Sequence, residues 1–261
     1  MKHQDHTSGS EPGLSRRDFL GLAAGATTLV VAPGVLLHQA AAAPRTEPVT
    51  SAVRWGLLID TAKCVDGCSA CVDACAHENG LDLQIEPQRE SADKWEHQRA
   101  TWIRKVKLQD NHSGRVTNLP LMCQHCAEPP CVDVCPTGAS FKRADGIVMV
   151  DRHLCIGCRY CMMACPYKAR SFIHQETSGQ LTQVPRGKGC VESCQLCVQR
   201  RDNGIDSTAC VDACAAEGHQ AILFGDLADP RSTIRQRLAE LPNRQIREDL
   251  ALNTGVRYAG I

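Results

Sequence analysis

The chain has 261 residues, and its 29 Lys and Arg balance 29 Asp and Glu, so the formal net charge is zero. This balance, without a long basic tract, argues against nucleic acid as a partner. Aromatic residues make up only 4% of the chain, whereas 17 residues are cysteine. Disulfides or bound metal must therefore supplement a modest apolar core.

Residues 1–43 are predicted to be an export signal. The stretch SRRDFL places Arg16 and Arg17 before an uncharged apolar segment, and HQAAAAP offers small-residue cleavage sites near Ala43. This order is typical of a signal peptide, and the paired arginines indicate the twin-arginine route. The protein is then expected in the periplasm, at the outer face of the cytoplasmic membrane. An uncleaved signal that anchors the chain is the alternative, although Pro33 makes the segment a marginal span.

After the signal, short strands alternate with cysteine-rich segments. RWGLLIDTAKC (54–64) predicts a strand that runs into the first cysteines. TWIRKVKL (101–108) and RVTNLPLM (115–122) predict two strands around a turn at DNHSG. FKRADGIVMVD (141–151) predicts a hairpin with an Asp-Gly pair at its turn.

Four groups of cysteines dominate the sequence. The third group, at 155–166, has the spacing C-x2-C-x2-C-x3-C followed by proline. This run ligates [4Fe–4S] clusters in bacterial ferredoxins, where in two-cluster versions the fourth cysteine binds the other cluster. The second group, at 123–136, also ends in proline, whereas alanine replaces that proline in the groups at 64–76 and 190–215.

The motif C-V-D-x-C recurs in the first, second and fourth groups. The two outer groups can therefore pair with each other, as the two central groups do. The predicted fold is α+β, with tandem bacterial-ferredoxin-like two-cluster units, one inserted in the other, small β-hairpins and a C-terminal helical tail that contains TIRQRLAEL. The predicted domains are the signal peptide 1–43, the first cysteine run with a β insertion 54–122, the central two-cluster unit 123–170, the fourth run 171–227 and a docking tail 228–261.

Four [4Fe–4S] clusters with four thiolates each would use all but one of the 17 cysteines. Cys190 is the surplus residue, because Cys194-x2-Cys197 matches the start of the other runs without it. Exchange of the fourth cysteine between paired runs then predicts four ligand sets. They are set 1, Cys64, Cys68, Cys71 and Cys214; set 2, Cys123, Cys126, Cys131 and Cys165; set 3, Cys155, Cys158, Cys161 and Cys135; and set 4, Cys194, Cys197, Cys210 and Cys75.

Other readings of the cysteines remain open. Zinc sites made of four cysteines usually combine two separated C-x2-C pairs, unlike the central runs, and disulfide frameworks do not require regular four-cysteine runs. Ala76 and Ala215 weaken the motif in the outer groups, so a zinc-held structural module, a [3Fe–4S] cluster or a missing cluster stays an alternative there. A free-standing redox enzyme is a further alternative, but the sequence contains neither G-x-G-x-x-G nor a phosphate-binding loop.

The motifs PPCVDVCPTGASFKRADGIVMVD and CIGCRYCMMACPY, with a final C-x3-C before FGDLADP, resemble one family. It is the family of four-cluster, NrfC-like electron-transfer subunits that serve molybdopterin oxidoreductases or membrane quinone proteins. The resemblance covers residue 54 to about residue 232. Within this family the signal peptide, RWGLLIDTAKC and LNTGVRYAGI are most similar to the exported, DsrO-type subunits of DsrMKJOP complexes of sulfur metabolism.

This resemblance implies an electron-transfer subunit rather than an enzyme, with four [4Fe–4S] clusters and no catalytic residues. It also implies an NrfD-like, polytopic, quinone-interacting membrane partner and a multihaem cytochrome c nearby. The alternative within the family is the β subunit of a periplasmic molybdopterin oxidoreductase of the tetrathionate, thiosulfate or polysulfide reductase type.

Replacement of both Arg16 and Arg17 by lysine should leave the iron-loaded protein in the cytoplasm, because the twin-arginine pair is the export signal. Cell fractionation with iron analysis of each fraction measures this, and Lys2→Gln serves as a control for a charge change in the same region. Periplasmic double variant in the wild-type amount would contradict the twin-arginine interpretation.

Overall fold

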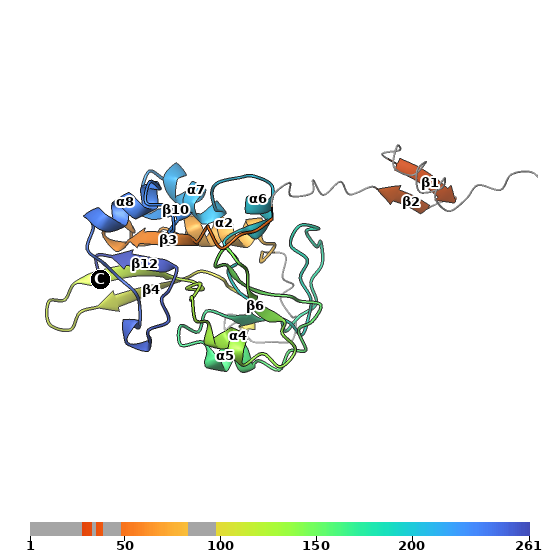
Figure 1. The fold of residues 1–261 in the computed structure, drawn as a ribbon, viewed down its shortest axis with the longest axis horizontal. Helices are drawn as coiled ribbons and strands as arrows, with labels where there is room; N and C mark the ends of the chain where they lie inside the picture. Colours follow the sequence, from red (N-terminus) through yellow and green to blue (C-terminus); the bar gives the residue numbers. More distant parts are fainter. Residues whose placement is uncertain (1–27, 33–34, 39–47, 83–97) are drawn as a thin grey trace, which may run out of the picture. The chain divides into compact units, whose positions relative to one another are not determined.

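The structure is a computed structural model, and it describes residues 28–32, 35–38, 48–82 and 98–261 (Figure 1). The chain divides into two compact units, of which the first ends at Pro44. In the first unit β1 (Thr28–Ala32) pairs antiparallel with β2 (Val35–His38). The twin arginines and the region near Ala43 lie outside the described residues, so the signal peptide stays a prediction.

A four-stranded sheet organises the second unit. β10 pairs antiparallel with β3, β12 runs parallel to β3, and β11 pairs antiparallel with β12. The strand order is β10 (Ile222–Asp226), β3 (Trp55–Asp60), β12 (Val256–Ala259) and β11 (Asn243–Arg244). The first strand of the unit thus lies between two strands from the other end of the chain (Figure 1).

The sequence of β3, WGLLID, accounts for its inner position. Leu57, Leu58 and Ile59 are all buried, as expected for a strand that is covered on both faces. Because side chains alternate between the faces of a strand, Leu57 and Ile59 join the main core, whereas Leu58 packs with Ile234. Ile234 belongs to α8 (Thr233–Glu240), so this helix covers the other face of the sheet.

Two pairs of short helices carry cysteines in the main core. α2 packs on α7, and α4 packs on α5. Their bounds, with those of the other helical segments described in the second unit, are η1 (Thr61–Lys63), α2 (Ala70–Glu78), α4 (Pro130–Asp133), α5 (Tyr160–Ala164), α6 (Val198–Asp202), α7 (Ala209–Ala216), α8 (Thr233–Glu240) and η2 (Glu248–Leu250).

Within the described part of the second unit, three hairpins complete the fold. They are β4 (Arg104–Gln109) with β5 (Val116–Leu121), β6 (Ser140–Lys142) with β7 (Val148–Val150), and β8 (Ser171–Phe172) with β9 (Val191–Glu192). The first two correspond to the predicted hairpins. β4 begins at Arg104, and Trp102 and Ile103 before it are buried in the main core. Gly146, with φ +86°, occupies the predicted turn between β6 and β7.

The main core is built around cysteine rather than around aromatic rings. Most of its buried sulfur atoms come from the four cysteine groups, and they are surrounded by aliphatic side chains such as Leu57 and Ile59. The few aromatic residues are placed where they fill this core, as Trp102 and Tyr258 do. The mixed content of helices and strands agrees with the predicted α+β class.

The segment 228–261 differs from the separate tail that its sequence predicts. It contains the expected helix α8, but it also supplies β12, whose residues Val256 and Tyr258 are fully buried. The Tyr258 hydroxyl donates to Pro120 O at 3.1 Å and accepts from Gln124 Nε2 at 3.0 Å. This part of the segment therefore belongs to the main core, while a docking role for its exposed surface stays a prediction.

Replacement of Tyr258 by alanine should lower the free energy of unfolding by about 3–5 kcal/mol, because it removes a buried ring from the core. Tyr258→Phe should cost about 1–3 kcal/mol, since it leaves buried hydrogen-bonding groups without their partner. Anaerobic urea denaturation, followed by the loss of secondary structure, measures both effects. The exposed Tyr160 provides the matched control, Tyr160→Ala, and equal midpoints for it and Tyr258→Ala would contradict the packing described here.

Candidate functional site

Helices α2 and α7 bring the two outer cysteine groups together. Each helix carries two buried cysteines four residues apart, Cys71 and Cys75 in α2, and Cys210 and Cys214 in α7. This spacing places both cysteines on one face of the helix. Because α2 packs on α7, the cysteines of one helix lie beside those of the other.

One pocket is lined by all four cysteines of set 1, which are Cys64, Cys68, Cys71 and Cys214. Lys105 of β4 fixes the loop that carries two of them, because its Nζ donates to Val65 O at 3.0 Å and to Cys68 O. Burial raises the pKa of the Cys64 thiol, and the Lys105 ammonium opposes this shift. Ala221 N donates to Cys214 Sγ at 3.2 Å, so a backbone dipole also points at this pocket.

A second pocket is lined by the four cysteines of set 4, which are Cys75, Cys194, Cys197 and Cys210. All four are buried, and Leu57 and Trp102 help to line the same pocket. Burial raises the pKa of Cys194 well above its ordinary value and that of Cys210 to about 12. A metal ligand must be deprotonated, so ligation at these sites would release protons.

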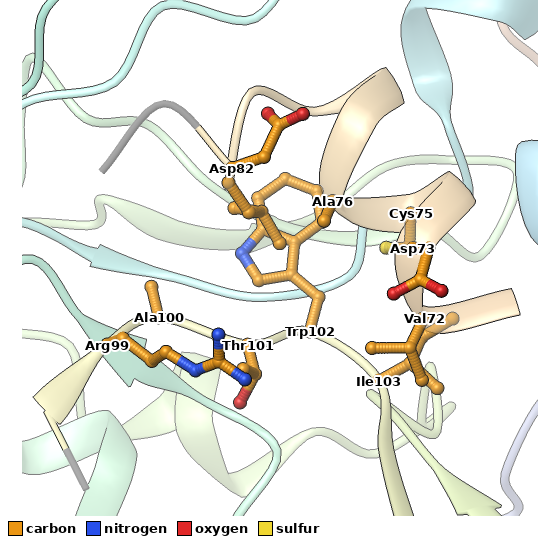
Figure 2. A pocket seen from close by; sticks show the side chains of 11 residues that line it. Val72, Asp73, Cys75, Ala76, Asp82, Arg99, Ala100, Thr101, Trp102 and Ile103 are labelled. Carbon is orange, nitrogen blue, oxygen red and sulfur yellow. The ribbon is translucent and has the colours of Figure 1, made fainter. Parts of the chain in front are cut away.

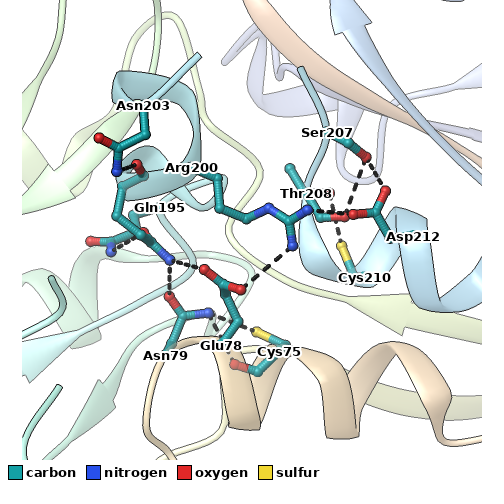
Figure 3. Close-up of polar contacts among 11 residues, drawn as sticks. Cys75, Glu78, Asn79, Gln195, Arg200, Asn203, Ser207, Thr208, Cys210 and Asp212 are labelled. Atoms are coloured by element: carbon teal, nitrogen blue, oxygen red, sulfur yellow. Dashed lines mark hydrogen bonds and ion pairs between the residues drawn. The ribbon is translucent and has the colours of Figure 1, made fainter. Parts of the chain in front are cut away.

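Polar side chains surround set 4 and connect the helices that carry it (Figure 3). Asn79 Nδ2 lies 3.7 Å from Cys75 Sγ, and Thr208 Oγ1 lies 3.3 Å from Cys210 Sγ. Above them, the Arg200 guanidinium of α6 pairs with Glu78 of α2 and with Asp212 of α7. This network ties three helices together beside one group of sulfur atoms.

Set 2 in the central unit is also wholly buried, and its members are Cys123, Cys126, Cys131 and Cys165. Burial, together with the neighbouring Cys131 and Cys165, raises the pKa of Cys123 to about 12. The same three influences act on Cys126, whose pKa is also raised to about 12. The four thiols of set 2 therefore lie close enough to act on one another.

Set 3 is the most accessible group. Cys158 is exposed, Cys135 and Cys155 are partly exposed, and only Cys161 is buried. Burial raises the pKa of Cys161, and the nearby Cys155 and Cys135 raise it as well. These three thiols are thus neighbours, and Cys158 lies in the same loop as Cys155 and Cys161.

Backbone geometry directs donors toward the sulfur atoms of set 3. Ser140 N donates to Cys135 Sγ at 3.3 Å, and Val191 N donates to Cys155 Sγ at 3.4 Å. The loop depends on Gly157, which has φ +70° and whose added Cβ would lie 2.3 Å from Gly189 O. Only glycine accepts both this conformation and this close approach.

The four sets follow one another in a row. Set 1 meets set 4 on helix α2, which carries cysteines of both. Set 4 meets set 2 where Cys194 lies within electrostatic range of Cys123, and set 2 meets set 3 at Cys131 and Cys161. The order is therefore set 1, set 4, set 2 and set 3, with wholly buried sets in the middle and partly exposed cysteines at the ends.

The side chains around these sets fit iron–sulfur clusters. Thiolates are soft ligands of the kind that such clusters use, and hydrogen bonds to sulfur tune them. In the described part of the chain, the buried His125 Nε2 and Arg170 Nε and Nη1 have no hydrogen-bond partner. His125 Nδ1 accepts from Val148 N at 3.1 Å, and burial followed by the Arg170 charge lowers the His125 pKa to about 3. The neutral ring then carries its proton on Nε2, a donor that a cluster sulfide could satisfy.

A third pocket, of about 320 Å³, lies beside set 4 (Figure 2). Trp102 lines both this pocket and the pocket of set 4, so its indole stands next to both. The remaining lining includes Asp73, Asp82 and Arg99. Trp102 is therefore a core residue, and it is 2% exposed.

Cys190 lies beside set 3 but has a partner of its own. Its Sγ donates to Arg152 O at 3.3 Å, and burial together with the nearby Cys155 raises its thiol pKa. Sequence reasoning missed two other residues, Lys105 and Arg170, whose side chains reach the cysteine groups. Both are isolated basic residues without a recognisable motif, so nothing in the local sequence distinguishes them.

Three observations concern the described residues alone. No three His, Cys, Asp or Glu side chains there converge closely enough to hold a single metal ion. None of the described helices combines the length and the apolar character that a membrane crossing needs. All 17 cysteines lie in the described part, and every one is free of disulfide bonds.

Comparison with known proteins identifies the chemistry of the cysteine groups. Two family profiles, both described as a 4Fe-4S dicluster domain, match residues 63–139 and 115–226. The cysteine groups are therefore iron–sulfur sites, and the zinc and disulfide readings are set aside.

Similar proteins extend over nearly the whole chain. Hdr-like menaquinol oxidoreductase iron-sulfur subunit 1 of Archaeoglobus fulgidus is 36% identical over 94% of this chain and 98% of its own length. Protein NrfC of Escherichia coli is 36% identical over 92% of both chains. The B subunit of tetrathionate reductase from Salmonella typhimurium is 39% identical over 69% of this chain and 61% of its own.

The exchange of the fourth cysteine between runs gives a direct test of the ligand sets. Cys165→Ser should remove about four irons and abolish the signal of the cluster held by the Cys123 run, although Cys165 belongs to another run. Cys190→Ser should leave the iron content unchanged. Iron analysis and EPR of anaerobically prepared protein measure both. Loss of a cluster from Cys190→Ser, with Cys194→Ser fully loaded, would show that set 4 is wrong.

Proposed function

The chain belongs to the NrfC-like family of iron–sulfur electron-transfer subunits, and from this premise we propose that it conducts electrons along four [4Fe–4S] clusters. It is an electron-transfer subunit of an oxidoreductase complex and not the catalytic subunit. The observation that carries the proposal is the grouping of the cysteines. Sets 1 and 4 each line one pocket, and neighbouring thiols act on one another within sets 2 and 3.

In this proposal each set holds one cluster, which when bound takes up and releases single electrons. The chain's own residues supply insulation and tuning. Complete burial of sets 2 and 4 excludes water from the middle of the row. Donors such as Ala221 N and Ser140 N, aimed at cysteine Sγ atoms, stabilise negative charge on the sulfur.

We also propose that the two ferredoxin-like units are nested. The central unit is 123–170, and the outer unit combines 54–122 with 171–227. Two features support this arrangement: α2 from before the central unit packs on α7 from after it, and β3 likewise pairs with β10. Within the central unit, α4 and α5 pack on each other in the same way.

Electrons then enter and leave at sets 1 and 3, the two ends of the row. At the set 3 end of the row, large apolar side chains are exposed to solvent in the isolated chain. Ile156 and Met163 are 67% and 66% exposed, and Leu154 and Tyr160 are about half exposed, beside the exposed Cys158. Contiguous exposed apolar residues mark interaction sites, so this apolar patch is proposed to contact a redox partner.

The partner is proposed to be an NrfD-like, polytopic, quinone-interacting membrane subunit. The support is that a relative covering nearly all of this chain is named as the iron–sulfur subunit of a menaquinol oxidoreductase. Export by the twin-arginine route would place the protein at the periplasmic face of the membrane. A multihaem cytochrome c is the proposed second partner, on the resemblance to DsrMKJOP complexes of sulfur metabolism.

A second assignment within the same class is favoured by a different relative. The tetrathionate reductase protein of Salmonella typhimurium shares 39% identity with this chain, which supports the β subunit of a molybdopterin oxidoreductase as the alternative. The two assignments differ in which protein exchanges electrons with the other end of the row of clusters. Identification of the subunits that co-purify with the tagged chain from gently solubilised membranes distinguishes them.

Reduction by a quinol tests the proposed function. In membranes that contain the full complex, a menaquinol analogue should reduce the clusters, or a quinone should oxidise them, as followed by EPR. The same chain purified without its membrane partner should not respond to either. If the protein is instead wholly soluble after gentle lysis, and exchanges electrons at full rate with a soluble carrier alone, the quinone-linked function is wrong.

Charge placed in the apolar patch should weaken the contact with the partner. Ile156→Glu and Met163→Glu should each reduce co-purification of the partner about tenfold, or ~1.4 kcal/mol, with an unchanged iron content. Val116→Glu, at a position that is 53% exposed on the β4–β5 hairpin, is the matched control and should have no effect. Equal loss of partner in all three variants, or in none, would contradict a contact at set 3.

A further inference from the structure

Arg170 is a buried cation that contacts two cysteine sets at once. The residue is only 6% exposed, and its Nη2 donates to Cys131 Sγ at 3.1 Å and to Ser140 Oγ at 2.7 Å. Cys131 belongs to set 2. The guanidinium also lies close to Cys161 of set 3, and its partner Ser140 donates its backbone N–H to Cys135 Sγ of the same set at 3.3 Å. A single fixed charge therefore bridges the two sets of the central unit.

The charge of Arg170 is not balanced by a carboxylate. In the described part of the chain two other buried or half-buried arginines do have such a partner: Arg186 pairs with Glu192 at 2.6 Å and Arg143 with Asp145 at 2.8 Å. Arg170 forms no such pair there, and its Nε and Nη1 are buried without any partner. An uncompensated buried guanidinium is costly, so the negative charge that balances it must come from the thiolates and what they hold.

We propose that Arg170 tunes both central clusters. Its positive charge raises the reduction potential of the cluster held by set 2 and that of the cluster held by set 3. This inference rests on the proposed function. Reduction adds negative charge, and a cation fixed nearby in a medium of low dielectric stabilises the reduced state. A hydrogen bond to the ligating sulfur acts in the same direction. Because one guanidinium lies beside both sets, it raises the two potentials together.

The planar fork of arginine is needed for this bridge. A guanidinium presents five donors in a fixed plane and can reach several acceptors, whereas a lysine ammonium is a compact point charge. Ser140 helps to orient the fork, since its hydroxyl accepts from the same nitrogen that donates to Cys131.

The test is a redox titration of each cluster by EPR in the exported holo-protein. Arg170→Met should lower the equilibrium constant for reduction about tenfold at the two central clusters, which is ~59 mV for one electron. The two outer clusters should keep their potentials. Arg170→Lys should give a smaller shift at the same two clusters, because it keeps the charge but loses the fork.

Arg104→Met is the matched control, because Arg104 donates to the carbonyls of Tyr167 and Lys168 in the same loop and is not bonded to a cysteine. It should leave all four potentials unchanged. If Arg170→Met fails to hold iron, Arg170→Lys decides the question.

If Arg170 variants are loaded with iron and the potentials of the two central clusters are unchanged, this inference is wrong, but the proposed function still stands. A uniform shift of all four clusters would also overturn this inference, since it would indicate a general structural effect. Absence of iron from the central cysteines of the unaltered protein would instead overturn the proposed function itself, and this inference with it.

Discussion

The burial of cysteine thiols is the constraint on which the rest of this structure depends. Sulfur atoms occupy the centre of the main core, and aromatic residues are too few to replace them. Burial raises the pKa of many of these thiols, as it does for Cys123 and Cys210, so they carry negative charge only when a positive centre compensates it. The free energy of metal binding is then part of the free energy of folding. Short loops and helices suffice because the bound group, in the proposed assignment, replaces a conventional core.

The secondary structure serves this arrangement in two ways. Helices of two turns, such as α2 and α7, present cysteines four residues apart on one face and pack in pairs, so each helix contributes to two sets. The sheet then closes the unit over long sequence distances, with β3 held between β10 and β12. Tyr258 on β12 lies within electrostatic range of Cys194 and Cys123, where set 4 meets set 2. The C-terminal strand thus belongs to the same core as the cysteines.

Local patterns in the sequence predicted what local physics determines. The run spacing identified the cysteine groups, the Asp-Gly pair located the β6–β7 turn, and TIRQRLAEL located α8. The strand β12 was missed because GVRYAGI is short and its partner β3 stands at the other end of the unit. Arg170 was missed because a buried arginine looks like any other basic residue until its neighbours Cys131 and Ser140 are known. The pairing of strands that lie far apart in the chain and the compensation of a buried charge both depend on tertiary structure. Neither produces a repeating pattern in the sequence.

The iron and acid-labile sulfide content of the anaerobically purified chain, combined with an EPR count of spins after full reduction, tests the central claim most directly. The account predicts about sixteen irons and about sixteen sulfides for each chain, in four separate one-electron centres, at four of each per cluster. Saturation at about half of these values after strict anaerobic reconstitution would contradict it, because only one of the two paired units would then hold clusters.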